Sequence, residues 1–247
     1  MTECFSKSKL TFMILGDTCT RSCTFCAVKN KSRQGAAIDP QTPKRIAALV
    51  KQLDLKYVVI TSVVRDDLDD GGASIFAETI KNIRSHNESV RIEVLIPDFL
   101  EKDGALQVVI TARPDVIAHN LETVKRLYPQ IKPKAEYNFS LQVLGRVKIL
   151  DRSIITKSSL TLGMGETEEE IFQAMRDLRR YGCNCLTLGQ YLAPSKDHYP
   201  VKEFIAPAQF EVYRLQGLGM GFTNVFAGPK VRSSYMAEEL LKESAGE

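Results

Sequence analysis

The sequence has little surplus charge, no long apolar run and few cysteines. Its 33 basic and 30 acidic residues give a net charge of +3, and no Lys/Arg block is dense enough to resemble a nucleic-acid tail. No apolar run approaches the roughly 18 residues of a membrane-spanning helix, and residues 1–7 lack the apolar core of a secretory signal. We therefore expect no nucleic-acid partner and no membrane association.

The cysteines number six in 247 residues, but three of them are crowded into one short stretch. This usage suits a reducing compartment and a cofactor better than a disulfide scaffold. We expect a cytoplasmic protein, or a mitochondrial or plastid one if a targeting segment has been lost.

The crowded cysteines, Cys19, Cys23 and Cys26, follow the apolar run 11–15 with the spacing C-x3-C-x2-C. A 4Fe-4S cluster has four iron corners and takes thiolate ligands, so three cysteines leave one iron open to a ligand that is not protein. A structural zinc ion prefers a fourth protein ligand, and this segment has no histidine, so zinc is disfavoured. Free buried thiols remain an alternative.

The cysteine spacing resembles the signature of the radical S-adenosylmethionine (SAM) enzymes. The resemblance implies that the amino and carboxylate groups of SAM chelate the open iron, and that an electron from the cluster cleaves the sulfonium to give a radical that attacks unactivated carbon. Phe25, which precedes the third cysteine, occupies the place of an aromatic residue that in this superfamily lies beside the adenine.

Short β-branched runs alternate with longer amphipathic segments along the chain, a pattern typical of βα units and a parallel sheet. The predicted strands are 11–16, 57–62, 91–96, 116–119, 137–141, 155–162, 186–190 and 225–227. The predicted helices are 42–53, 74–85, 104–111, 167–181 and 207–217, with a frayed helix at 238–247. At this length we expect one α/β domain, a partial or near-complete (β/α) TIM-type barrel of the radical SAM kind.

Several separate blocks resemble the lipoyl synthase family, a branch of the radical SAM enzymes. They are residues 11–17, 57–72, 93–99, 119–123, 156–158, 163–167, 186–192 and 228–235. The resemblance implies a sulfurtransferase of lipoate biosynthesis that inserts two sulfur atoms, at C6 and C8, into a protein-bound octanoyl group. It also implies an octanoylated lipoyl carrier domain or H protein as partner, and an electron donor such as flavodoxin or ferredoxin.

The same resemblance implies a second, auxiliary 4Fe-4S cluster that supplies the sulfur. Cys4 matches the last of three family cysteines spaced C-x4-C-x5-C, and Ser233 or Ser234 would be the fourth ligand. The chain begins before the other two cysteines could appear, so we expect a truncated form with competent SAM binding and impaired lipoate formation. The expected regions are a remnant of the auxiliary segment at 1–10, the barrel at 11–221 and the serine-bearing segment at 222–247.

Several polar side chains are expected at the carboxyl ends of the strands, where catalytic loops of barrels collect. Arg65 and Asp66 are candidates to bind the SAM carboxylate and amine through charge-assisted hydrogen bonds, although a solvated turn is the alternative. Asn120 and Glu122 are candidates for the ribose hydroxyls. The remaining candidates are Lys157, as a partner of the SAM carboxylate or a surface lysine, and Gln190, in the substrate channel.

Two other functions remain open at this stage. The chain could be a radical SAM enzyme of another substrate class, which keeps SAM cleavage and lacks sulfur insertion. It could also be a non-catalytic metal-binding barrel. Cys183 and Cys185 precede the strand at 186–190, so we expect them to be core or surface thiols at the opposite face of the barrel.

Overall fold

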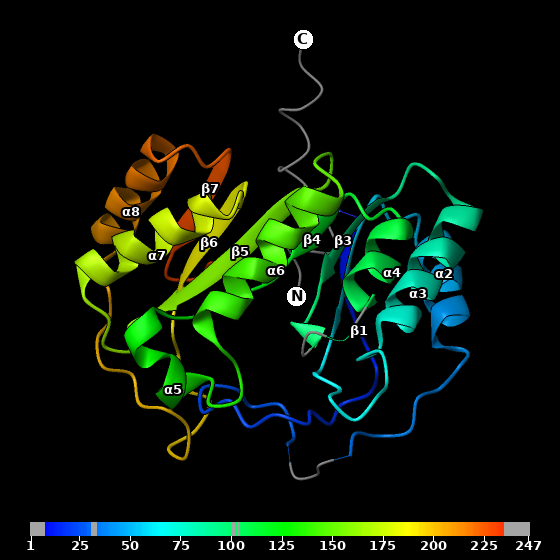
Figure 1. The fold of residues 1–247 in the computed structure, drawn as a ribbon, viewed down its shortest axis with the longest axis horizontal. Coiled ribbons are helices and arrows are strands. Elements are labelled where there is room, and N and C mark those ends of the chain that lie inside the picture. The colour runs from blue at the N-terminus through cyan, green and yellow to red at the C-terminus, as the bar shows by residue number, and fades with distance from the viewer. Residues whose placement is uncertain (1–7, 31–33, 100–101, 103, 235–247) are drawn as a thin grey trace.

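A seven-stranded parallel sheet forms the centre of the protein (Figure 1). The computed structural model describes residues 8–30, 34–99, 102 and 104–234. Each strand pairs with the next one along the chain, in the order β1 to β7. The strands are β1 (Lys9–Ile14), β2 (Tyr57–Ser62), β3 (Arg91–Leu95), β4 (Val116–Ala118), β5 (Ile155–Leu162), β6 (Cys185–Gln190) and β7 (Asn224–Gly228). Within the described chain β1 and β7 do not pair, so the barrel is open between them.

Helices cover the outer face of the sheet (Figure 1). They are α2 (Thr42–Gln52), α3 (Ala73–His86), α4 (Ala105–Thr111), the 3-10 turn η2 (Lys125–Leu127), α5 (Tyr128–Ile131), α6 (Tyr137–Leu150), α7 (Glu168–Arg180) and α8 (Pro207–Gly219). The apolar core has two main clusters, one under α2, α3 and α4 and the other under α5 to α8.

The two faces of the sheet differ in chemistry because successive side chains of a strand point to opposite sides. Val58 and Ile92 belong to the apolar cluster under the first helices. Their neighbours Tyr57 and Glu93 point to the other side, into the barrel, where the Tyr57 hydroxyl donates to the Glu93 carboxylate at 2.8 Å. The lumen is therefore lined with polar groups.

The sequence predicted seven of these strands, but its prediction for residues 137–141 is wrong. That segment begins helix α6, and its buried residues Tyr137, Leu141 and Leu144 pack in the second apolar cluster. A short apolar run in a buried strand cannot be distinguished by periodicity from one face of a buried helix. The sheet also extends from Lys9 to Gly228, beyond the expected barrel range 11–221.

The predicted start of α7 is confirmed in atomic detail. Thr167 accepts a hydrogen bond from the backbone N–H of Glu170, and the Glu170 carboxylate accepts one from the backbone N–H of Thr167. This reciprocal capping satisfies two N–H groups that the first turn of a helix otherwise leaves unpaired. The predicted helix at 238–247 lies outside the described residues.

Candidate functional site

The three cysteines lie in the loop that follows β1. The chain leaves the strand through Leu15 and Gly16, whose φ angles of 69° and 84° turn the backbone sharply toward the carboxyl end of the barrel. Backbone hydrogen bonds then fix the loop: Cys19 N–H donates to Lys29 O at 2.8 Å, and Thr20 N–H donates to Val64 O at 3.0 Å. The loop is thus held against the residues that follow β2.

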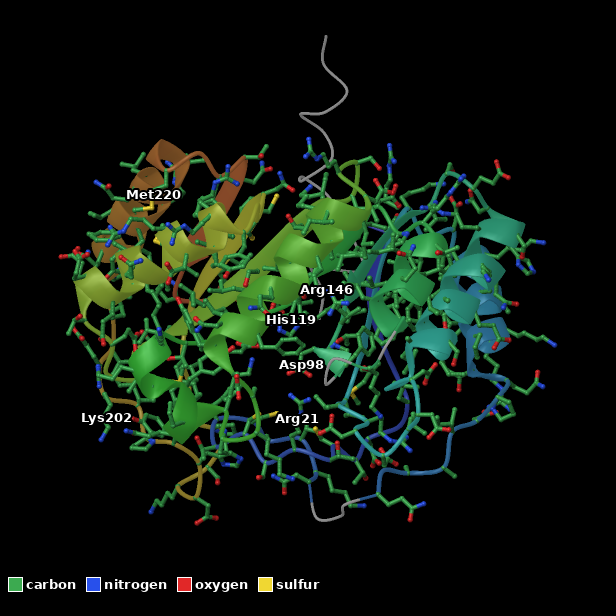
Figure 2. All side chains as sticks on the ribbon, viewed as in Figure 1. Arg21, Asp98, His119, Arg146, Lys202 and Met220 are labelled. Atoms are coloured by element: carbon green, nitrogen blue, oxygen red, sulfur yellow. The ribbon has the colours of Figure 1, made fainter. Side chains whose placement is uncertain are left out.

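Arg21 anchors this loop through two carboxylates. Its guanidinium donates to both oxygens of Asp66 at 2.9 and 3.0 Å, and to both oxygens of Asp98 at 2.6 and 2.7 Å. Burial favours the neutral form, but the hydrogen bonds that Arg21 donates to Asp98 and Asp66 outweigh it and raise the pKa of Arg21 further. Figure 2 shows Asp98 between Arg21 and His119, on the line from the loop toward the strands. Bidentate pairs of this kind fix orientation as well as charge.

The cysteines open onto a cavity of about 350 Å³. All three are partly exposed, so each can reach a bound group. Burial raises the pKa of the Cys23 thiol to about 11, and the ammonium of Lys132 partly opposes that rise. Burial likewise raises the pKa of Cys26. The thiols would release their protons on binding a metal, as thiolate ligands must. The cavity is also lined by Arg21, Phe25, Ser62, Asp98, His119, Asn120, Glu122 and Lys132.

The residues of this cavity fit a cluster with a polar ligand better than a single metal ion. Within the described part of the chain, no three His, Cys, Asp or Glu side chains converge as a mononuclear site requires. The thiolates of a 4Fe-4S cluster surround one cube but bind different irons, so they lie farther apart than the ligands of a single ion. Three buried polar atoms of the lining, Ser62 Oγ, His119 Nε2 and Asn120 Oδ1, have no partner in the protein. Such atoms are costly unless a ligand or water satisfies them.

His119 presents an acceptor to the cavity. Its Nδ1 lies 2.9 Å from the carbonyl oxygen of Ile96, which can only accept, so Nδ1 carries the proton. Burial, followed by the charge of Lys132, lowers the pKa of His119 to about 4. At neutral pH the ring is uncharged, and the unpartnered Nε2 has a free lone pair.

The predicted pair Asn120 and Glu122 lies between the cysteine cavity and a second cavity of about 230 Å³. Asn120 Nδ2 donates to Glu122 Oε1 at 2.9 Å, which fixes the two side chains together. Phe25 lines both cavities beside them. The structure therefore brings together the aromatic residue and the polar pair that the sequence assigned to one ligand.

Arg65 and Asp66 do not have the free groups that the prediction required. Arg65 is 3 % exposed, and its guanidinium donates to Asp67 at 2.8 and 2.9 Å and to Leu15 O at 3.0 Å. Asp66 is bound by Arg21. These residues hold the loops of the barrel end in place, and these contacts give no support to their assignment to direct SAM binding, which stays a prediction.

Lys157 lies deep in the barrel, at the third position of β5. It is 1 % exposed, and its Nζ lies 3.0 and 3.1 Å from the Glu93 carboxylate oxygens. Its strand partners are Cys185, the first residue of β6, and Ala118, the last residue of the three-residue strand β4. The prediction that Lys157 pairs with the SAM carboxylate gains no support, because the Glu93 carboxylate already neutralises its charge.

Gln190 is also occupied by the protein itself. Its Nε2 donates to the carbonyls of Tyr191 and Glu203 at 2.9 and 3.0 Å, and its Oε1 accepts from Ile205 N–H at 2.9 Å. A Cβ on Gly163 would lie 2.4 Å from Gln190 Nε2, so only glycine at position 163 leaves room for the Gln190 side chain and its hydrogen bonds. Gln190 lines the second cavity, but its side chain is committed to the loop at 203–205.

The serine-bearing segment crosses the end of β6. A Cβ on Gly189 would lie 2.2 Å from Val231 O, which shows how closely the two backbones approach. Ser233 lines the second cavity, whereas the carbonyl of Ser234 accepts from Lys9 Nζ at 2.9 Å. Cys4 lies outside the described residues, so its predicted role as an auxiliary ligand stays a prediction.

Other features lie away from this site. Cys183 and Cys185 are 0 % and 2 % exposed at the start of β6, which confirms that they are core thiols. A larger hollow of about 1230 Å³ is at the opposite end of the barrel, between the starts of β3 and β5, and none of the cysteines lines it. No helix of the described chain is long and apolar enough to cross a membrane.

Sequence reasoning missed two residues of the cavity. Arg21 was hidden because its partners, Asp66 and Asp98, follow different strands and meet it only in the folded barrel. Lys132 was missed because it follows α5, a helix of four residues, which is too short to give a periodic sequence pattern. Lys132 lines the same cavity as Cys23.

Comparisons with known proteins agree with this geometry. The model of the radical SAM superfamily matches residues 13–178. A lipoyl synthase of Caldicellulosiruptor saccharolyticus is 53% identical over 97% of this chain and 84% of its own length, and one of Alkaliphilus metalliredigens is 53% identical over 98% and 82%. The crystal structure of HydG, a maturase of the [FeFe]-hydrogenase, superposes with a TM-score of 0.70 at 13% identity, over 94% of this chain and 54% of that one, which shows a shared fold.

Proposed function

Because the chain belongs to the lipoyl synthase family within the radical SAM superfamily, we propose that it inserts sulfur at C6 and C8 of a protein-bound octanoyl group. Membership of the family makes it a radical SAM sulfurtransferase that uses a 4Fe-4S cluster and SAM. When bound, the cluster and SAM supply the reductive chemistry that activates an unreactive C–H bond.

One observation carries the proposal: three partly exposed cysteines open onto a cavity that also has unpartnered polar atoms. Cys19, Cys23 and Cys26 would hold three irons and leave the fourth toward the cavity. The unpartnered atoms suit a ligand with hydrogen-bonding groups rather than an apolar one. A structural metal site would instead be closed by protein ligands.

The neighbouring residues support distinct roles in binding SAM. Phe25 offers a ring face for the adenine, and Asn120 with Glu122 offers polar atoms for the ribose diol. Arg21 orients the cysteine loop through its two carboxylates and does not touch the ligand in this proposal. His119 acts as an acceptor and not as a general base, because hydrogen-atom removal needs no base.

The auxiliary cluster belongs to the finer part of the proposal. Ser233 is the better candidate of the two serines, because it lines a cavity, whereas the Ser234 backbone is bound to Lys9. The described contact joins the serine segment to the first residue of β1, which follows Cys4 by five positions in the sequence. The protein partners are an octanoylated lipoyl carrier domain or H protein and a flavodoxin or ferredoxin as electron donor.

The proposal is tested by anaerobic reconstitution with iron and sulfide, followed by reduction in the presence of SAM and an octanoylated carrier peptide. We expect release of 5'-deoxyadenosine. A peptide that gains two sulfur atoms, measured by mass spectrometry, would show a working sulfur donor and overturn the impaired lipoate formation expected from the sequence. Hydrogen loss without sulfur would support the radical chemistry and contradict a working sulfur donor. Absence of SAM cleavage by a fully loaded protein would contradict the whole assignment.

A further inference from the structure

A broad basic groove lies at the amino ends of the strands, away from the cysteines. It consists of two adjoining hollows, of about 1230 and 230 Å³, which share Ser153 and Ile155 in the loop before β5. In Figure 1 this loop lies at the top of the molecule and the cysteine loop at the bottom. We call the two hollows together the amino-end groove. Its cations come from several loops and helix ends and are Lys81, Arg84, Arg91, Arg113, Lys148 and Arg152.

The amino-end groove has a surplus of positive charge. Its six cations face three carboxylates, those of Glu88, Asp115 and Asp151, so the surplus equals the net charge of +3 of the whole chain. Arg84 and Arg91 share the single carboxylate of Asp115, at 2.6 and 2.9 Å. The other cations form no ion pair within the described chain, and they are Lys81, Arg113, Lys148 and Arg152. A surface of this kind attracts an acidic occupant.

The groove also has apolar surface beside its cations. Ala112, Pro114 and Ile154 line it and are buried. At its rim, Ile149 and Leu150 end helix α6 and are 82 % and 44 % exposed, directly before a residue that lines the groove. An occupant that is acidic and also carries apolar side chains is therefore complementary to this surface.

The described chain ends beside this end of the barrel. Ser234 is the last described residue, and its carbonyl accepts a hydrogen bond from Lys9 Nζ at 2.9 Å. In the sheet Lys9 pairs with Tyr57, and Tyr57 pairs with Arg91, which lines the groove. Ser234 is thus one lysine side chain away from the row of strand residues to which Arg91 belongs.

The sequence that follows Ser234 has the composition that the groove requires. Residues 235–247 lie outside the described residues, and they contain four glutamates, one lysine and the apolar pair Leu240 and Leu241. Their net charge of three negative charges matches the surplus of the groove. Thirteen residues span about 20 Å as a helix and up to about 45 Å when extended. The four strand spacings from β1 to β5 amount to about 20 Å, so the segment is long enough.

We propose that residues 235–247 dock in the amino-end groove of their own chain. The glutamates face the groove cations, and Leu240 and Leu241 cover Ile149 and Leu150. This docking does not depend on the proposed function. It would anchor the serine-bearing segment from its far side, because residue 235 follows Ser234 directly and the groove lies across the barrel from Lys9.

The test is cross-linking of the full chain with a carbodiimide, which joins a carboxylate to an amine only where the two are in contact. Linked peptides from the monomer are identified by mass spectrometry. We expect links from the glutamates of 235–247 to Lys81 or Lys148. The surface pair Lys56 and Asp54, 2.7 Å apart, is the internal reference for the reaction.

Paired variants separate the role of charge from the position of the lysines. Arg113→Lys with Arg152→Lys keeps both charges and adds two amines, so new links should form at these positions. In Arg113→Gln with Arg152→Gln the yield of links to the groove should fall at least about threefold. About 0.5 M salt should act in the same direction, because it screens exposed charges. Lys44→Gln with Arg45→Gln removes two exposed cations of α2 and should leave the yield unchanged.

The docking is overturned if the reference pair links while the glutamates of 235–247 form no link to the groove, even in the variant with two added lysines. It is also overturned if these glutamates link to Lys125, an exposed residue of η2, as strongly as to the groove, or if the links occur only between two copies of the chain. Iron content and SAM cleavage should be the same in the parent and in Arg113→Gln with Arg152→Gln. Links to the groove in a loaded protein that does not cleave SAM would contradict the proposed function and still support the docking.

Discussion

The two ends of the barrel lumen use buried polar groups in opposite ways. Away from the cysteines, in the part of the lumen that we name the closed end because its polar groups pair with one another, Tyr57, Glu93 and Lys157 satisfy one another within 3.1 Å. At the open end, the cysteine cavity contains Ser62, His119 and Asn120, each with an unpartnered buried atom. The other unpartnered side-chain atoms of the described chain, in Thr123, Arg179 and Thr187, line neither cavity.

This comparison indicates which buried polar groups serve the fold and which serve a ligand. A satisfied network stabilises one arrangement of the core, and it resists change because removing one member leaves the others unpaired. An unsatisfied group costs stability and persists where a ligand completes it. The comparison therefore predicts that substitutions at the closed end change stability, whereas those at the open end change binding.

The largest expected effect is at the open end. Cys23→Ala removes one of the three thiolates, so reconstituted protein should hold far less iron and form no measurable 5'-deoxyadenosine. The midpoint of urea unfolding for the cluster-free protein should stay close to that of the parent. Cys185→Ala, at the closed end, is the matched control and should retain iron and activity. Equal iron loss in both variants would contradict the comparison.

Breaking the closed-end network should give the largest loss of stability. Glu93→Ala leaves Lys157 charged and unpaired, so we expect the free energy of unfolding to fall by about 3 to 5 kcal/mol. Replacing both partners, as in Glu93→Leu with Lys157→Met, should recover most of that loss. Chemical denaturation measures both. If the double variant is no more stable than the single one, the ion pair is not the cause.

A pH effect of intermediate size is expected from His119. Burial lowers its pKa to about 4, below the unfolded value of 6.5, so the unfolded chain binds more protons between these values. Stability from this group is present above pH 6.5 and is lost as pH falls toward 4. From pH 7 to pH 4.5 the cluster-free parent should lose about 2 to 3 kcal/mol more than His119→Gln.

The control for this pH effect is His86→Gln, which removes an exposed histidine on α3. Its stability should follow the parent at both pH values, measured by guanidinium unfolding. A pH dependence in His119→Gln equal to that of the parent would show that His119 does not stay neutral in the folded protein.

The smallest expected effect tests a residue that links the two behaviours. The hydrogen-bonding groups of Arg21 have protein partners, as those of the closed end do, but Arg21 lines the cysteine cavity at the open end. Arg21→Lys should therefore affect both stability and cluster binding. Losing the planar fork removes charge-assisted hydrogen bonds, and we expect a loss of about 1 to 2 kcal/mol. Iron per chain should fall in parallel. If iron content is unchanged while stability falls, Arg21 stabilises the fold and has no role in cluster binding.

The sequence predicted the features of this protein that depend on local pattern. The strands of the sheet are short β-branched runs, and the cysteine spacing is set within eight residues, so both are visible without the fold. The strand prediction for residues 137–141 is wrong because the same apolar residues can also form the buried face of a helix. Cys183 and Cys185 were placed correctly because their position before a strand determines the end of the barrel at which they lie.

The sequence did not predict which polar residues pair with each other. Lys157 and Glu93 are 64 positions apart in the sequence, and they meet only because the register of the sheet places them at the same level inside the barrel. Arg65 follows the end of β2 and Gln190 is the last residue of β6, yet Asp67 and the loop at 203–205 occupy their side chains. The position of a residue in its strand predicts the end of the barrel at which it lies. Whether its side chain is free to bind a ligand depends on hydrogen-bond partners that only the folded structure shows.

The contact between Lys9 and Ser234 has a mechanical consequence. In the described chain the ring of strands has one seam, between β1 and β7, where no backbone ladder forms. There an ammonium donates to a carbonyl 225 positions away, a hydrogen bond whose loss costs about 1.5 to 3 kcal/mol, whereas parting any two neighbouring strands would break a whole ladder. Among the described residues, opening the barrel at this seam therefore breaks fewer hydrogen bonds than separating any two paired strands.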